Sequence, residues 1–170
     1  MPKIIKNLKE QLVTTARAQL SSLGYSGMTV RSVAAECGVG IGTVYNYFEN
    51  KDALVAAVMI EDWHECLSGV ERSKTARDTL YAIHRALIDF AEKYSAVFQD
   101  PEAHSAFSAV QGERHKQLRD RLAAYVIPFI AESDEGEAAL RAAVITESLM
   151  THTLEGVAFR ALYPVISKLL

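Results

Sequence analysis

Apolar residues recur at spacings of three and four in every extended segment of this chain. This is the repeat of an amphipathic helix, and no stretch shows the alternation of β-branched residues that is typical of a strand. The pattern therefore predicts an all-α fold with short connections. We expect helices over residues 4–23, 29–37, 40–47, 51–71, 75–98, 101–110, 112–131 and 134–163, with a break at Pro164.

The composition is that of a globular chain, because 49% of the residues are apolar and 23% are charged. The longest apolar run, residues 140–150, is interrupted by Arg141 and Glu147, whereas a membrane span needs about 18 uncharged residues. The N-terminus is too short and polar for a secretory signal, so we expect no membrane partner and a cytoplasmic location. Cys37 and Cys66 have neither disulfide nor zinc-ligand spacing, and we expect no metal and no cofactor.

Charge is unevenly distributed along the chain, although the net charge is only −3. Residues 1–51 carry six Lys or Arg and three acidic residues, which gives +3, whereas residues 52–170 carry a net −6. The positive charge of residues 1–51 favours contact with phosphates, whereas the negative charge of residues 52–170 opposes it. The asymmetry favours a nucleic-acid partner for the N-terminal part.

Two short helices around a glycine turn are predicted in residues 29–48. Thr29 is a favourable N-cap for the first, Gly38 interrupts the chain, and Asn50 caps the long helix that begins at Lys51. The helix at the N-terminus closes these two into a three-helix unit. The inward-facing apolar stripe of this N-terminal helix is expected to be Ile5, Leu8, Leu12, Ala16, Leu20 and Leu23. The two short helices complete the interior. The other expected interior residues are Val30, Val33, Ala34, Val39, Val44 and Phe48.

The outer face of the second short helix is polar and aromatic. It is more aromatic than ordinary solvated surface, and the helix itself is short. Both properties suit insertion into the major groove of DNA, which is about 12 Å wide. The pattern therefore predicts a helix-turn-helix. The outward-facing residues are Gly42, Thr43, Tyr45, Asn46 and Tyr47.

The same segment resembles the N-terminal signature of the TetR family of transcription regulators, and the resemblance covers residues 4–58. It implies a DNA-binding domain at 1–50 and a helical regulatory, ligand-binding and dimerisation domain at 51–170. It also implies a homodimer that binds a palindromic operator on double-stranded DNA as a repressor released by ligand. The resemblance rests on Gly24-Tyr25, Thr29-Val30-Arg31, Gly38-Val39, Gly42-Thr43-Val44-Tyr45, Tyr47-Phe48 and Lys51.

Carried over by position, the resemblance implies two kinds of DNA contact, to phosphates and in the groove. Asn46 is suited to reading adenine, and Gly42 permits close backbone approach. Two alternatives to DNA contact stay open. Thr29 can act as a helix cap without touching DNA, and Tyr45 can be chiefly a packing residue. The implied phosphate contacts are Thr29, Arg31, Tyr47 and Lys51, and the implied groove contacts are Ile41, Gly42, Thr43, Tyr45 and Asn46.

Two positions depart from the family pattern. Gly40 stands where Ser or Thr is usual. The N-cap of the second short helix, which is the recognition helix of the motif, therefore lacks a side-chain acceptor. Ile41 stands where a basic or polar base reader is frequent, and its side chain suits a thymine methyl. We therefore expect DNA binding that relies on phosphate contacts and apolar groove contacts, with an A·T pair facing Ile41.

Beyond residue 58 the resemblance concerns only the layout of the helices. That layout implies a cavity for an inducer in the body, and the aromatic residues there favour a small, largely apolar or aromatic ligand. The more ordinary interpretation of each of these residues is a core aromatic or a hydrogen-bonded histidine. The candidate ligand-binding residues are Trp63, Tyr81, His84, Phe107, Tyr125 and His152.

The helix expected at 134–163 carries more apolar surface than one buried stripe needs. The resemblance implies that it pairs with its copy across a twofold axis, in a four-helix bundle with the helix that follows it. That following helix is here reduced to residues 164–170. The strength of the homodimer is therefore left open.

An enzyme is a competing hypothesis, because the chain has five histidines. None of them lies in an H-x-x-x-H or H-E-x-x-H pattern, and neither a G-x-S-x-G motif nor a glycine-rich phosphate loop is present. We therefore expect no catalytic residues. The remaining alternative is a helical interaction protein with lost or weak DNA binding, motivated by Gly40 and Ile41.

Overall fold

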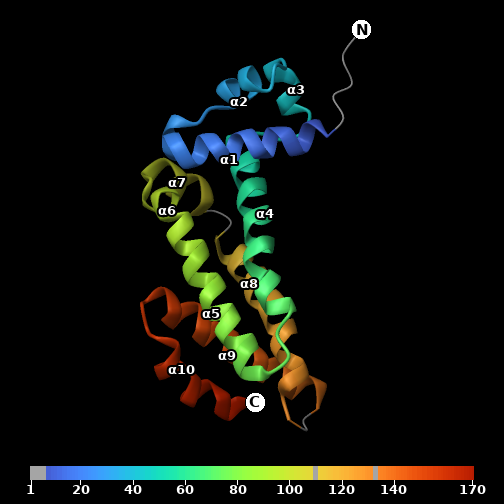
Figure 1. Cartoon of the computed structure of the whole chain (residues 1–170), viewed down its shortest axis with the longest axis vertical. Coiled ribbons are helices and arrows are strands. Elements are labelled where there is room, and N and C mark those ends of the chain that lie inside the picture. The colour runs from blue at the N-terminus through green and yellow to red at the C-terminus, as the bar shows by residue number, and fades with distance from the viewer. Residues whose placement is uncertain (1–6, 109–110, 132–133) are drawn as a thin grey trace. The chain divides into compact units, whose positions relative to one another are not determined.

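The computed structural model describes residues 7–108, 111–131 and 134–170, and every regular element in these ranges is helical (Figure 1). The predicted all-α class is confirmed for these residues. The chain forms two compact units, each built from two segments. Unit 1 contains the described residues up to Asp62 and those from Tyr94 to the end of α7, and unit 2 contains the rest. This division differs from the expected boundary after residue 50, because the segment from Tyr94 packs with the N-terminal helix.

The N-terminal helices of unit 1 begin and end at caps that the sequence predicts. Thr29 Oγ1 accepts a hydrogen bond from the Ser32 amide at 3.0 Å, and Asn50 Oδ1 accepts one from the Ala53 amide at 2.8 Å. Gly24 has a φ of 72°, a left-handed conformation that interrupts the first helix near its end. The elements are α1 (Leu8–Gly27), α2 (Val30–Glu36), α3 (Ile41–Tyr45) and α4 (Lys51–Glu71), and α4 continues into unit 2.

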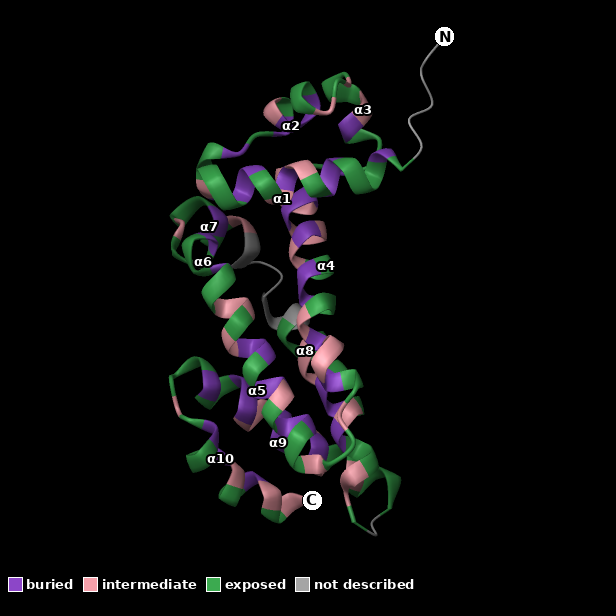
Figure 2. Ribbon diagram, in the orientation of Figure 1, coloured by how far each residue is buried: buried purple, intermediate pink, exposed green. Residues whose placement is uncertain are grey.

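Apolar side chains form the interior of unit 1, and Figure 2 shows the buried stretches along α1 and α4. Two predicted interior positions deviate, because Val39 is only half-buried and Leu23, next to the interruption at Gly24, is 56% exposed. Ile5, which shares the predicted stripe, lies outside the described residues. The predicted interior residues that are buried are Leu8, Leu12, Ala16, Leu20, Val30, Val33, Ala34, Val44 and Phe48.

Two short helices follow Tyr94. The second was expected over residues 101–110, but the first lies where the helix over residues 75–98 was expected to continue. The backbone leaves helical geometry at Tyr94, with φ −105° and ψ 12°, and α5 ends at Lys93. Neither glycine nor proline marks this break. The Tyr94 hydroxyl instead donates a 2.6 Å hydrogen bond to the buried Asp62, a tertiary contact that no local pattern reveals. The two elements are α6 (Ser95–Gln99) and α7 (Pro101–Ser108), and both pack against α1.

Unit 2 is a helical bundle with a continuous hydrophobic core. In it α9 packs against α5 and α8, and α10 packs against α5 and α9. The C-terminal part of α4 adds Trp63, Leu67 and Val70 to the same core. The elements are α5 (Ala76–Lys93), α8 (Gln111–Val126), η1 (Ile127–Phe129), α9 (Glu135–Leu154), α10 (Phe159–Ile166) and η2 (Ser167–Leu169), where η marks a 3-10 turn.

The expectation of one helix over 134–163 is wrong, because the chain turns after Leu154. Gly156 has a φ of 85°, a region that favours glycine, and it separates α9 from α10. Pro164 does not break the helix as expected, since it lies inside α10, which continues to Ile166. A proline removes one backbone hydrogen bond, and the burial of three α10 side chains offsets that loss.

Replacing Gly156 with alanine should destabilise unit 2. A Cβ there meets nothing within 4 Å, so the cost comes from the left-handed φ alone. That conformation costs an L-residue about 1–2 kcal/mol, which thermal unfolding should detect. Gly69 in α4 is the matched control, because a Cβ there also meets nothing within 4 Å and its backbone is helical. Gly69→Ala should stabilise the fold by about 0.5–1 kcal/mol. A loss of stability in both variants would contradict the explanation from the φ of Gly156.

Candidate nucleic-acid interface

The outer face of α3 is the candidate DNA-reading surface. Its inner side is anchored by Val44, which is fully buried, whereas Ile41, Tyr45 and Tyr47 are 38%, 49% and 46% exposed. Side chains of this size and polarity on a surface helix form a ready contact for a partner. The other predicted groove contacts are Gly42 and Asn46, which are exposed, and Thr43, which is half-buried.

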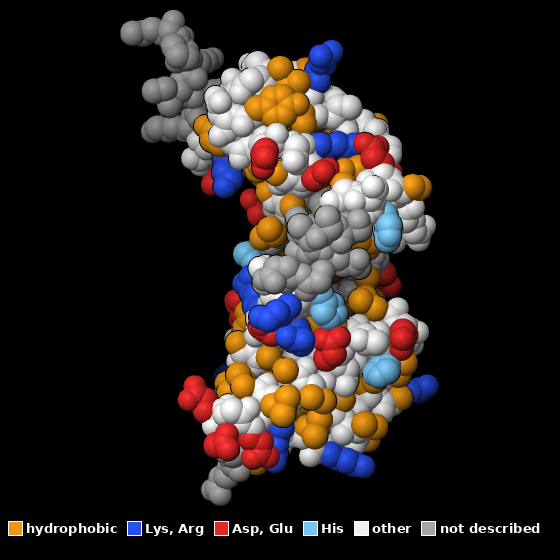
Figure 3. Space-filling model, turned by 180° about the vertical axis from the view of Figure 1, so that it is seen from behind, with side chains coloured by type: hydrophobic (Ala, Val, Ile, Leu, Met, Phe, Trp, Pro, Cys, Tyr) orange, Lys and Arg blue, Asp and Glu red, His pale blue; other side chains and the backbone are white. Residues whose placement is uncertain are grey.

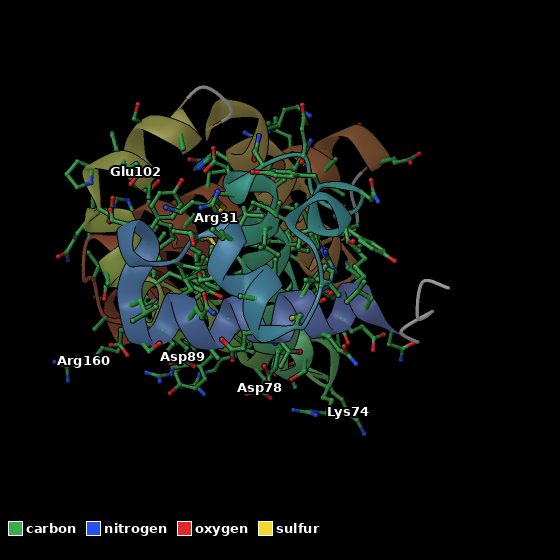
Figure 4. All side chains as sticks on the ribbon, turned by 90° about the horizontal axis from the view of Figure 1, so that it is seen from above. Arg31, Lys74, Asp78, Asp89, Glu102 and Arg160 are labelled. Carbon is green, nitrogen blue, oxygen red and sulfur yellow. The ribbon has the colours of Figure 1, made fainter. Side chains whose placement is uncertain are left out.

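The start of α2 carries the predicted phosphate contacts Thr29 and Arg31. Thr29 forms a capping box, because its hydroxyl accepts from the Ser32 amide and its own amide donates to Ser32 Oγ at 3.2 Å. Arg31 is exposed and makes no ion pair within the part of the chain that the structure describes (Figure 4). Thr29 therefore serves as a cap, and Arg31 is the available cation at this end of α2.

A short series of hydrogen bonds fixes α2 against α1. Ser32 Oγ donates to Gln19 Oε1 at 2.6 Å, and Gln19 Nε2 donates to Glu36 Oε2 at 2.6 Å. Gln19 is only 8% exposed, so its side-chain amide needs hydrogen-bond partners within the protein. Ser32 and Glu36 supply them. Sequence reasoning missed this link, since the polar residue lies on the buried side of α1.

The N-terminus of α3 lacks a side-chain cap, as expected from Gly40. The Gly40 carbonyl accepts from the Thr43 amide at 2.9 Å, but no side-chain hydrogen bond closes the turn. Glycine in place of serine at an N-cap costs a few tenths of a kcal/mol, on the order of 0.3. The departure from the family pattern therefore weakens α3 only slightly.

Lys51, the fourth predicted phosphate contact, is held by other residues of unit 1. Its Nζ lies 4.0 Å from the centre of the Tyr25 ring and 3.7 Å from Glu102 Oε1. The Tyr25 hydroxyl donates to Asp52, and burial together with that hydrogen bond raises the pKa of Tyr25. A phosphate at Lys51 therefore has to compete with the Glu102 carboxylate.

The start of α7 is tied to the end of α1 by hydrogen bonds between residues far apart in the sequence. Ser26 Oγ donates to Asp100 Oδ2 at 2.6 Å and lies 3.2 Å from Glu102 Oε2. The Ser26 hydrogen bond is the main cause that lowers the pKa of Asp100. These acidic residues lie beside the head, the DNA-binding domain expected at residues 1–50. No local signal in the sequence could have placed them there, because they lie 74 and 76 residues away from Ser26.

A buried carboxylate joins three helices of unit 1. Asp62, at 2% exposure, accepts from Arg17 Nε at 2.7 Å and from the Tyr94 hydroxyl at 2.6 Å. Arg17 also donates to Glu61 at 2.8 Å. Burial alone lowers the pKa of the Arg17 guanidinium, but the hydrogen bonds and charges of Glu61 and Asp62 together raise it. The cluster therefore holds α1, α4 and the start of α6 in one arrangement.

The predicted ligand-binding residues whose side chains the structure describes do not all line one cavity. Trp63 lies in the core of unit 2 with its ring edge-on to Phe90 at 5.2 Å, and its Nε1 has no hydrogen-bond partner among the described residues. Tyr125 donates to Glu71 at 3.1 Å. His152 is exposed and lies beside Glu155. The Phe107 side chain lies outside the described part of the chain, so its role stays a prediction.

Two of the predicted residues, Tyr81 and His84, do line one cavity. It is a groove of about 840 Å³ in unit 2, formed by α5, the C-terminal end of α9 and α10. Its volume is that of a small-molecule site. His84 is buried, and burial together with the charge of Arg85 lowers its pKa, so the ring is neutral at pH 7. Sequence reasoning missed Phe159 and Tyr163, which line the same groove from α10.

Two other kinds of feature, a membrane-spanning helix and a metal cluster, do not occur in the described ranges. No helix there is long and apolar enough to cross a membrane. No three His, Cys, Asp or Glu side chains in those ranges lie close enough together to hold a metal ion.

A buried three-helix scaffold that presents an exposed short helix is the geometry of a helix-turn-helix DNA-binding protein. Residues 12–58 match the family described as bacterial regulatory proteins, tetR family. The match to this family is confined to that N-terminal segment, which contains α2 and α3. The chain is 27% identical over 125 residues to an uncharacterized HTH-type transcriptional regulator of Mycobacterium tuberculosis. That match covers 69% of this chain but only 59% of the relative, so the chain spans less than two thirds of its length.

Solved structures share the fold at low sequence identity. RolR in complex with resorcinol has a TM-score of 0.57 and 16% identity, over 96% of this chain and 86% of RolR. A TetR/AcrR-family regulator of Thermobifida fusca has a TM-score of 0.52 and 14% identity, over 95% of this chain and 93% of its own. The family model and the relative both describe transcription regulators.

Proposed function

We propose that this chain is a cytoplasmic transcription repressor that binds a palindromic operator as a homodimer and is released by a small ligand. The outer face of α3 carries the proposal, because exposed Ile41, Tyr45 and Tyr47 stand on a helix whose opposite side is buried. Such a face on a short helix suits the major groove. The match of residues 12–58 to the family of bacterial regulatory proteins supports DNA binding, and RolR, solved with resorcinol, supports a small aromatic effector.

The proposed contacts divide into anchoring and reading. Arg31 and Tyr47 anchor the head on phosphates, with Lys51 behind them and Thr29 acting through its cap. Asn46 reads adenine through its amide, and apolar contact with a thymine methyl supplies further selectivity. The residues that face the groove are Ile41, Gly42, Thr43, Tyr45 and Asn46.

A gel-shift experiment tests DNA binding. The full chain is mixed with palindromic DNA taken from beside its own gene, at low and at moderate salt. A shift that weakens as salt rises is expected, because phosphate contacts release counterions. Absence of any shift at low salt would overturn the proposal and favour a helical interaction protein that has lost DNA binding.

Removing the Glu102 carboxylate should strengthen operator binding. Glu102→Gln frees Lys51 from its 3.7 Å ion pair, and an exposed pair of this kind is worth up to about 1 kcal/mol, or about fivefold in affinity. Glu49→Gln, which removes the same charge from an exposed residue of the head, is the control. Equal gains for both variants would show a general charge effect, and the proposed competition at Lys51 would be wrong.

The homodimer is proposed to form through α9. Three large apolar side chains on this helix are strongly exposed: Leu140 at 66%, Val144 at 44% and Leu154 at 60%. Spacings of four and ten residues place them on one side of a helix. Figure 3 shows hydrophobic side chains gathered on a face of unit 2. A second copy of α9 would remove this surface from water.

Leu140→Asp should convert the dimer to a monomer. A charge buried at the centre of an apolar interface is strongly unfavourable, and the side chain is exposed enough in one chain for the fold to tolerate it. Size-exclusion chromatography with light scattering measures the mass. Leu23→Asp on α1, where the leucine is 56% exposed, is the control that should leave the mass unchanged. An unchanged mass for Leu140→Asp would argue against α9 as the interface.

The groove of unit 2 is the proposed effector site, and α5 links it to the head. Tyr94 follows α5 directly and bonds Asp62 of α4, which in turn bonds Arg17 of α1. We propose that a ligand shifts α5 and α4, and so changes the separation of the recognition helices in the dimer from about 34–36 Å. Spin labels on α3 should report this change, and an unchanged distance on release from DNA would contradict it.

A further inference from the structure

The groove of unit 2 has an aromatic wall. Phe159 stands at its centre, with ring centroids 5.2 Å from Tyr81, 5.6 Å from His84 and 5.4 Å from Tyr163. The rings come from α5 and α10 and line the same cavity. A planar ring can pack edge-on or offset against such a wall.

The groove also carries an excess of positive charge. Arg77, Arg85 and Arg160 line it, against the single carboxylate of Glu92. Arg85 is paired with Asp89 at 2.7 Å, and the Arg77 guanidinium lies 5.8 Å from the centre of the Tyr163 ring. Neither Arg77 nor Arg160 makes an ion pair with any described residue, and Figure 4 shows the Arg160 side chain extended away from the ribbon. Two cations are therefore available to a ligand.

His84 adds a polar atom to the otherwise aromatic wall. It is 5% exposed, and its Nδ1 is 2.8 Å from Thr153 Oγ1. That contact uses one ring nitrogen and leaves Nε2 for a ligand. Burial and Arg85 lower the pKa of His84, so the ring offers a neutral hydrogen-bonding group rather than a third free cation.

We propose that the groove binds a planar aromatic carboxylate, with its ring against Phe159 and Tyr81 and its carboxylate on Arg160 and Arg77. A guanidinium matches a carboxylate through two parallel hydrogen bonds, and the aromatic wall excludes a strongly hydrated sugar phosphate. Only the role of this ligand as the effector that releases DNA rests on the proposed function. Binding itself requires neither DNA nor the head.

Calorimetric titration of the full chain without DNA tests the charge requirement. The probes are 2-naphthoate and 2-naphthol, which share a ring system but differ in charge at neutral pH. Naphthoate should bind at least about tenfold more tightly, because a hydrogen bond to a charged group contributes about 1.5–3 kcal/mol. Equal affinities for the two probes, or no naphthoate binding at millimolar concentration, would overturn the inference.

Two variants and a control locate the ligand. Arg160→Ala should weaken naphthoate about tenfold and leave naphthol unchanged, whereas Tyr81→Ala should weaken both. Arg72→Ala, an exposed arginine outside the groove, should change neither. Naphthoate affinity that survives Arg160→Ala and Arg77→Ala would overturn the assignment. A gel shift that persists in the same preparation shows that the proposed DNA-binding function stands even if the ligand inference fails.

Discussion

Asp62→Ala is expected to lower the free energy of unfolding by about 3 kcal/mol, a large effect for a single side chain. The carboxylate is 2% exposed and accepts two short hydrogen bonds, from Arg17 on α1 and from Tyr94 at the start of α6. Removing the carboxylate leaves the buried Tyr94 hydroxyl without this acceptor and the Arg17 guanidinium without this charge partner. Urea unfolding followed by circular dichroism measures the loss.

The neighbouring carboxylate is the matched control. Glu61 pairs with the same Arg17 at 2.8 Å, but its side chain is 51% exposed, so Glu61→Ala should cost less than about 1 kcal/mol. Asp62→Asn, which keeps the shape and one acceptor oxygen, should lie between the two. Equal losses for Asp62→Ala and Glu61→Ala would show that burial of the carboxylate does not decide its contribution.

Gly42→Glu is expected to abolish operator binding while leaving the fold intact. Gly42 is exposed, has an ordinary φ, and a Cβ there meets nothing within 4 Å. The substituted carboxylate would face the DNA from the recognition helix, where a like-charge contact costs several kcal/mol, or at least about a hundredfold in affinity. Gel shifts against the operator measure this loss.

Gly69→Glu repeats the same substitution outside the head. Gly69 lies in the part of α4 that belongs to unit 2, and a Cβ there also meets nothing within 4 Å. This variant should bind the operator as the unchanged chain does, and both variants should unfold at temperatures close to it. Retained binding by Gly42→Glu would remove α3 from the DNA interface.

The head could be predicted because its determinants are local. The Thr29 cap, the break at Gly38 and the buried positions of α2 and α3 follow from residues within a few positions of one another. The body was predicted less well at its breaks. The end of α5 depends on Tyr94 and its distant partner Asp62, and the turn after α9 depends on Gly156, which the stronger stop signal of Pro164 obscured.

The candidate DNA contacts could be predicted from the sequence better than the groove of unit 2 could, for the same reason. Spacing along α3 indicates which side chains face outward once Val44 is buried. The same spacing cannot reveal that Glu102 reaches Lys51 or that Phe159 meets Tyr81, because these contacts depend on how separate helices converge. Periodicity assigns residues to faces of single helices, and tertiary packing decides which faces share a site.

Hydroxyl-radical footprinting on the operator tests the central claim most directly. Two recognition helices in successive major grooves should protect two patches on one face of the DNA, about 10 base pairs apart from centre to centre. Both patches should disappear with Gly42→Glu and remain with Gly69→Glu. Uniform protection, or none at low salt, would contradict the proposal that the exposed face of α3 reads DNA.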